Sequence, residues 1–177
     1  MFEGEEIIKK LKEPFPLVDV EWRVQQSGAK DGKPWARVLC YVTNRAIMKR
    51  LDEVFGCMGW KNEYRPSPDG GVLCGISVWN EAQKEWITKW DGAENTQVDA
   101  VKGGLSGAMK RAAVQWGIGR YLYYLDSAFA TCHLDNKGKH RAQALKNKND
   151  RNSGTIYFTW DEPEMPKWSL PKPKEQA

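Results

Sequence analysis

Residues 97–116 constrain the fold more than any other segment, because their apolar side chains recur with the period of an α-helix. At about 100° per residue, these side chains fall within one arc of about 100°, which is typical of a helix that packs one face on a core. The arc consists of Val98, Val101, Leu105, Ala108, Met109, Ala112 and Trp116. The segment therefore predicts a helix with one buried face.

The opposite side of this helix consists of small residues. Gly103, Gly104 and Gly107 each disfavour a helix by about 1 kcal/mol relative to alanine, and Lys110 and Arg111 border them. In one interpretation, a phosphodiester chain approaches the bare backbone while the two cations neutralise its phosphates. In the other, the glycines allow close packing between elements and the cations are merely solvated. The spacing alone does not decide between the two.

The rest of the chain predicts two shorter helices and several strands. One helix covers residues 3–12, and a second covers residues 44–55, with Thr43 as its N-cap and Gly56 as its stop. The polar side of the second helix, interpreted as a solvated face, carries Arg45, Lys49, Arg50, Asp52 and Glu53. The predicted strands are residues 17–24 and 35–42, which form a hairpin, residues 60–65, 72–79 and 85–90, which are antiparallel, and residues 155–160.

Two segments near the C-terminus are predicted to lack regular structure. Between residues 137 and 151 there are six lysines or arginines against Asp150, with little to bury, which indicates a mobile loop or arm. The last seventeen residues include four prolines and predict an extended tail.

The composition excludes several classes of protein. With 177 residues, of which 41% are hydrophobic and 28% charged, the chain can fill one core. A net charge of +4 permits a polyanionic partner without requiring one. No segment approaches the roughly 18 apolar residues of a membrane span, and we expect neither a spanning nor a secreted protein. Nine tryptophans can fill a core or stack on bases, and we expect packing and subunit contacts to use most of them.

The sequence does not predict an enzyme. The turn at residues 117–120 lacks the third glycine of a dinucleotide fingerprint. The sequence also lacks a glycine-rich phosphate-binding loop that ends in Gly-Lys followed by serine or threonine, so we expect no nucleotide cofactor. The acids Asp91, Glu94 and Asp99 fit a helix N-terminus better than a metal site. The two histidines and four cysteines match no metal or nucleophile motif, and the cysteines are expected to be reduced thiols.

Residues 102–123 resemble the signature of the Rad52/Rad22 family of single-strand annealing proteins, in its compact bacterial and phage form. Two further blocks agree in order and spacing. Residues 45–60 end in Val-Phe-Gly-Cys-Met-Gly-Trp, and residues 91–94 read Asp-Gly-Ala-Glu. The resemblance covers about residues 5–130.

The resemblance implies an α+β fold in which an antiparallel β-sheet packs on a long central helix, with copies of the chain assembled into a ring or helical filament. It implies binding of single-stranded DNA and annealing of complementary strands, without nucleotide hydrolysis, in homologous recombination and DNA repair. The alternative is an end-protecting or accessory DNA-binding protein without annealing activity. Expected partners are single-stranded DNA, further copies of the chain, and a single-strand binding protein or exonuclease, in the cytoplasm of a bacterial host.

The resemblance also implies a site and a domain organisation. The family's Lys-Arg pair in the DNA groove falls on Lys110 and Arg111, and a family arginine falls near Arg45, whereas a third basic position is Val114 here. Residues 1–130 would form the annealing and oligomerisation domain, residues 131–160 a basic arm and late strand of that domain, and residues 161–177 a disordered tail. The predicted DNA contacts are Lys110, Arg111, Arg45, Lys49, Lys102 and Arg120.

Overall fold

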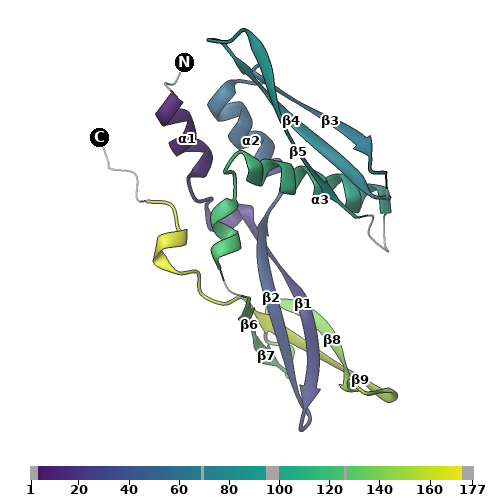
Figure 1. Ribbon diagram of the computed structural model, residues 1–177. Helices are drawn as coiled ribbons and strands as arrows, with labels where there is room; N and C mark the ends of the chain where they lie inside the picture. The colour runs from purple at the N-terminus through teal and green to yellow at the C-terminus, as the bar shows by residue number, and fades with distance from the viewer. Residues whose placement is uncertain (1–3, 69, 95–99, 126, 173–177) are drawn as a thin grey trace.

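The computed structural model describes residues 4–68, 70–94, 100–125 and 127–172 (Figure 1). The helices and one sheet lie at one end of an elongated molecule, and a long hairpin with the remaining strands forms the other end. In chain order the elements are α1 (Gly4–Lys12), a 3₁₀ turn (Leu17–Asp19), β1 (Val20–Lys30), β2 (Lys33–Val42), α2 (Asn44–Phe55), β3 (Trp60–Pro66), β4 (Val72–Asn80), β5 (Glu85–Ala93), α3 (Ala100–Gln115), a second 3₁₀ turn (Arg120–Tyr124), β6 (Ala128–Phe129), β7 (Thr131–His133), β8 (His140–Asn147), β9 (Asp150–Asp161) and a third 3₁₀ turn (Lys167–Ser169).

The first part of the molecule is an antiparallel sheet, β3–β4–β5, with helices on one face. Cys74, Ile76 and Val78 alternate along the central strand β4 and are buried. Ser77 on the opposite face is also buried, and its hydroxyl is hydrogen-bonded to the Thr88 hydroxyl over 2.8 Å. Met109 of α3 is buried in the same core as Cys74 and Ile76, and the Trp116 indole N–H donates to the Ile76 carbonyl oxygen over 3.0 Å. The predicted α+β class and this antiparallel trio are confirmed.

The second part is built on the β1–β2 hairpin, whose turn is Asp31-Gly32. Strand β6 pairs with β2, and β7, β9 and β8 form a separate antiparallel sheet that lies against the hairpin (Figure 1). Its small core includes Val38, Ala144, Phe158 and Trp160, all buried. The predicted hairpin is confirmed, and its strands extend further toward the turn than the sequence indicates.

Local signals place α2 correctly. The Thr43 side-chain oxygen accepts a hydrogen bond from the Ala46 amide over 3.1 Å, and Gly56 ends the helix with a φ of 73°, in the left-handed region that glycine favours. Ile47 and Leu51 are fully buried. The N-cap, the buried stripe and the stop all agree with the sequence prediction.

The prediction of a mobile basic arm over residues 137–151 is wrong for the segment that forms β8. Strand β8 pairs with β9 over most of its length. Ala142 and Ala144 face the small core, opposite Phe158 and Ile156, whereas Arg141 and Gln143 at the alternate positions are exposed. Small apolar residues between cations were therefore enough to form a half-buried strand.

The C-terminal segment differs from the expected disordered tail as far as residue 172. Met165 packs against the larger core, and Ser169 is fully buried, with its hydroxyl donating to the Pro166 carbonyl oxygen over 2.8 Å. The prolines rigidify a segment that lies on the protein surface. Residues 173–177 of the predicted tail lie outside the described part of the chain.

Arg50 is buried, contrary to the prediction that it lies on a solvated face of α2. Its Nη1 donates to the carbonyl oxygens of Lys10 and Glu13 over 2.7 and 2.8 Å. Its guanidinium also lies 4.2 Å from the centroid of the Phe15 ring. Arg50 thus satisfies carbonyls at the end of α1 and attaches this helix to α2.

Candidate nucleic-acid interface

Lys110 lies at the junction between the two parts of the molecule. Its Nζ is 4.0 Å from the centroid of the Tyr41 ring on β2, and the Arg23 guanidinium of β1 lies 6.0 Å from the same centroid. Burial lowers the pKa of Lys110, while the negative charge of Glu21 opposes this shift and the positive charge of Arg23 adds to it. Two cations therefore flank one aromatic ring where α3 meets the hairpin.

Arg111, the next residue along α3, is held in place by Asp91 of β5. Its Nε donates to Asp91 Oδ1 over 2.9 Å, and Asp91 Oδ2 accepts from the Gln115 side-chain amide over 3.0 Å. The Arg111 side chain is 54% exposed, whereas Asp91 is only 20% exposed. The carboxylate thus orients the guanidinium while leaving much of it accessible to a phosphate.

This arrangement lowers the pKa of the Asp91 carboxyl group. Partial burial by itself raises the pKa of Asp91, but hydrogen bonds from Gln115, Arg111 and the Gly92 amide outweigh burial and hold the pKa below its ordinary value. Because the folded-state pKa is depressed, the contribution of Asp91 to stability is complete above about pH 4 and is lost as the pH falls through the folded-state value.

Asp91→Asn is expected to strengthen binding to single-stranded DNA about threefold at low salt, because a negative charge beside Arg111 is removed. Stability should fall by at most about 1 kcal/mol, since the pair is partly exposed. Fluorescence anisotropy and urea unfolding measure the two effects. Asp135→Asn is the matched control, because Asp135 pairs with Lys137 over 2.8 Å in the loop between β7 and β8. Equal effects of both variants on DNA affinity would contradict a local role for Asp91.

Three further predicted contacts, Arg45, Lys49 and Lys102, are exposed. Arg45 and Lys102 lie in the first turns of α2 and α3, and Lys49 lies one turn further along α2. Arg45 follows Tyr41 by four residues, which limits their separation to about 14 Å. Lys49 is 70% exposed, and its Nζ lies 3.9 Å from Glu53 Oε1. These three residues remain predicted DNA contacts.

Arg120 has a structural position that the sequence analysis did not foresee. Its Nε and Nη2 donate to the Val114 carbonyl oxygen over 2.9 and 2.7 Å, and Nη2 also donates to the Gln115 carbonyl oxygen over 3.0 Å. These carbonyls belong to the last turn of α3, whose acceptors have no partner within the helix. Arg120 therefore caps α3, and we do not include it among the proposed DNA contacts.

The glycines of α3 are explained by packing where the structure describes their surroundings. A Cβ atom added to Gly107 would lie 3.0 Å from the Cβ of Ala93 on β5, and Gly104 is buried. Of the two interpretations, close packing between elements accounts for Gly107. Lys110 and Arg111 remain the predicted DNA contacts of α3, whereas the glycine at position 107 is explained by packing.

Two residues of this junction were missed by sequence reasoning, Tyr41 and Arg23. Both lie in predicted strands, but no local signal shows that β1 and β2 pass beneath Lys110.

Within the described ranges, no group of three or more histidine, cysteine, aspartate or glutamate residues is arranged to hold a metal ion. Asp99, which the sequence places near Asp91 and Glu94, lies outside these ranges. None of the helices described is long and apolar enough to cross a membrane.

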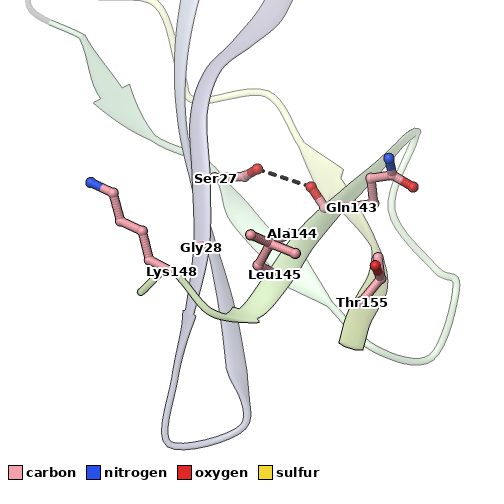
Figure 2. Close-up of a pocket in the computed structure, with 7 residues that line it drawn as sticks. All are labelled: Ser27, Gly28, Gln143, Ala144, Leu145, Lys148 and Thr155. Atoms are coloured by element: carbon pink, nitrogen blue, oxygen red, sulfur yellow. Dashed lines mark hydrogen bonds between the residues drawn. The ribbon is translucent and has the colours of Figure 1, made fainter. Parts of the chain in front are cut away.

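The molecule also has a shallow pocket of about 290 Å³ between β1 and the β8–β9 hairpin (Figure 2). The Ser27 hydroxyl donates across it to the Gln143 carbonyl oxygen over 2.9 Å. Of the seven residues that line it, only Lys148 is charged. They are Ser27, Gly28, Gln143, Ala144, Leu145, Lys148 and Thr155. The pocket thus reflects packing between two hairpins, away from the cations of α3.

Comparison with known proteins identifies the family of this chain. Residues 3–71 and 72–141 match the Rad52/22 family of double-strand break repair proteins, and the chain belongs to this family. It is 31% identical over 170 residues to the single-stranded DNA-binding protein DdrA of Deinococcus radiodurans, an alignment that covers 94% of this chain and 68% of that protein. It is 32% identical over 123 residues to DdrA of Deinococcus deserti, covering 68% of this chain and 58% of the relative.

Proposed function

We propose that this protein binds single-stranded DNA and anneals complementary strands, without nucleotide hydrolysis, in DNA repair by homologous recombination. The observation that carries the proposal is the pair of adjacent cations on α3, Lys110 over Tyr41 and Arg111 held by Asp91, in a member of the Rad52/22 family. The relatives named as single-stranded DNA-binding proteins support the same ligand. The cellular compartment that we infer is the bacterial cytoplasm.

The proposed mechanism uses the cations to hold one strand by its phosphates. Lys110 and Arg111 bind adjacent parts of the backbone, and Arg45, Lys49 and Lys102 extend the contact along α2 and α3. Backbone contacts position a strand without reading its sequence. The base edges then stay available to a second strand, which samples registers until base pairing holds it. The chain acts by binding alone in this scheme.

The domain organisation is part of the proposal. We assign strand annealing and self-assembly to residues 1–130, with copies of the chain arranged in a ring or a helical filament. Strands β7–β9 stabilise the hairpin β1–β2 of that domain, and the cations of β8 offer a surface for a second strand. A single-strand binding protein or an exonuclease is the proposed protein partner.

Renaturation of two complementary labelled oligonucleotides tests the proposal. The full chain without nucleotide is expected to accelerate annealing at least tenfold over the spontaneous reaction, with a rate that falls as salt rises. A matched reaction with non-complementary strands controls for aggregation. Binding without acceleration would overturn the annealing function and favour an end-protecting or accessory role. Absence of single-strand binding would overturn both.

A further inference from the structure

The face of the β3–β4–β5 sheet that points away from the helices carries tryptophans where polar residues are usual. Because Cys74 and Ile76 of β4 are buried in the same core as Met109 of α3, side chains at the alternate positions of β4 point to the opposite face of the sheet. Trp79 of this face lies opposite Trp86 of β5. Their exposed fractions are 37% and 38%. A sheet with one solvated face normally alternates apolar and polar residues, so these two rings need a separate explanation.

The rings on this face are held in defined positions. Trp79 and Trp86 meet edge to face, with 5.5 Å between ring centroids, and the Trp79 indole N–H donates to Glu81 Oε2 over 2.7 Å. The Trp90 ring lies over Gly75, where an added Cβ atom would come within 2.6 Å of the ring. Glycine at position 75 therefore makes room for an indole that lies flat on the sheet.

Two cations from β3 stack on the same rings. Lys61 Nζ lies 4.8 Å from the centroid of Trp86, and Arg65 Cζ lies 4.5 Å from the centroid of Trp90. The Arg65 side chain is 61% exposed, so its guanidinium plane is accessible from the solvent side. Aromatic faces and arginine planes are the groups on which unpaired bases stack.

The charge on this face is small, which indicates how a ligand would be held. Lys61 and Arg65 are partly offset by Glu63, whose Oε1 lies 3.7 Å from Arg65 Nη2. A strand bound here would gain affinity mainly from stacking of its bases, with one or two phosphate contacts. Covering the face with protein would instead remove water from the two stacked cations, which is unfavourable without an anionic partner.

We propose that this surface, the tryptophan face (Lys61, Arg65, Trp79, Trp86 and Trp90), is a second contact for single-stranded DNA, on which bases stack. It lies on the open side of the sheet, whereas Lys110 and Arg111 belong to the helix on the other side. The inference rests on the proposed function for the identity of its ligand. The two surfaces divide the task, since one binds phosphates and the other binds bases.

The test compares an oligothymidylate of 30 nucleotides with an abasic strand of the same length. The wild-type chain is expected to bind the oligothymidylate at least tenfold more tightly, because stacking adds affinity that a bare backbone lacks. Trp79→Ala combined with Trp86→Ala should remove most of this preference while leaving the salt dependence unchanged. Trp168→Ala is the matched control, because Trp168 is 55% exposed but lies in the C-terminal segment.

Each outcome has a defined meaning. If the double tryptophan variant keeps the preference for bases while the wild type still binds, the inference fails and the proposed function stands. If the wild type binds neither strand, the proposed function fails, and the inference fails with it. If the variant changes the mass of the protein measured by light scattering, the face is a contact between copies and the inference is wrong.

A second measurement uses the wild-type protein, so it tests the inference even if the double tryptophan variant does not fold. Wild-type protein is crosslinked by light to an oligonucleotide containing 5-iododeoxyuridine, and the crosslinked peptides are identified by mass spectrometry. Crosslinks to β4 and β5 at Trp79, Trp86 or Trp90 are expected. Crosslinks confined to the junction around Tyr41 would overturn the inference.

Discussion

Lys110→Ala combined with Arg111→Ala is expected to weaken binding to single-stranded DNA by about 10- to 100-fold at moderate salt. Each lost phosphate contact reduces the slope of log affinity against log salt by about 0.7 for a single strand, so two contacts reduce it by about 1.4. Fluorescence anisotropy at several salt concentrations measures both quantities. Annealing should slow in parallel, because the strand is no longer held by its backbone.

The double variant should remain folded, which makes the experiment decisive. The Lys110 ammonium stacks on Tyr41 and Arg111 is 54% exposed in its ion pair, so the loss of stability should be about 1 kcal/mol. Lys9→Ala combined with Lys167→Ala is the control, since both side chains are exposed and the change in charge is the same. An unchanged affinity and salt slope in the folded double variant would show that the DNA groove lies elsewhere.

Arg50→Met is expected to lower the free energy of unfolding by about 3 kcal/mol. The substitution keeps a side chain of similar length but leaves the carbonyls of Lys10 and Glu13 without the charged donor that now reaches both. Hydrogen bonds to charged groups contribute about 1.5–3 kcal/mol each, and part of that loss is recovered by solvation of the freed carbonyls. Urea unfolding measures the change, and faster cleavage within α1 by a protease would locate it.

Two further variants sharpen this experiment. Lys49→Met lies one residue earlier on α2 with a 70% exposed side chain, and it should change stability by less than about 0.5 kcal/mol. Arg50→Lys keeps the charge but not the planar guanidinium, so an intermediate loss is expected. A stability of Arg50→Met equal to that of the wild type would contradict the anchoring role of Arg50.

The features that sequence reasoning predicted well are those encoded within a few residues. Thr43 and Gly56 bound α2 because a cap and a left-handed stop are local backbone properties. Strands β3, β4 and β5 follow from turn residues between β-forming segments. Lys110 and Arg111 were singled out by their place beside the glycines of α3 and by a resemblance in motif. The family assignment is confirmed, while their role in binding DNA remains a prediction.

Other features depend on segments that are distant in the chain. Nothing near Arg50 shows that the end of α1 would surround it, and nothing near Arg120 distinguishes a cap of α3 from a DNA contact. Strand β8 was missed because its small apolar residues acquire a core only when β9 and the hairpin β1–β2 pack beside them. In each case the role of the residue or strand depends on a contact partner that only folding brings near.

The sequence by itself therefore determined α2 with its caps, strands β1 to β5 and the family, because helix periodicity, turn chemistry and motif order are all local properties. The tertiary structure alone decided which cations are available. Arg50 and Arg120 bind backbone carbonyls, whereas Arg111 is oriented by Asp91 and stays exposed. It also decided that Trp79 and Trp86 share an exposed face. The physical reason is that the role of a charge or a ring depends on burial and on its partners, and these are fixed by contacts between distant segments.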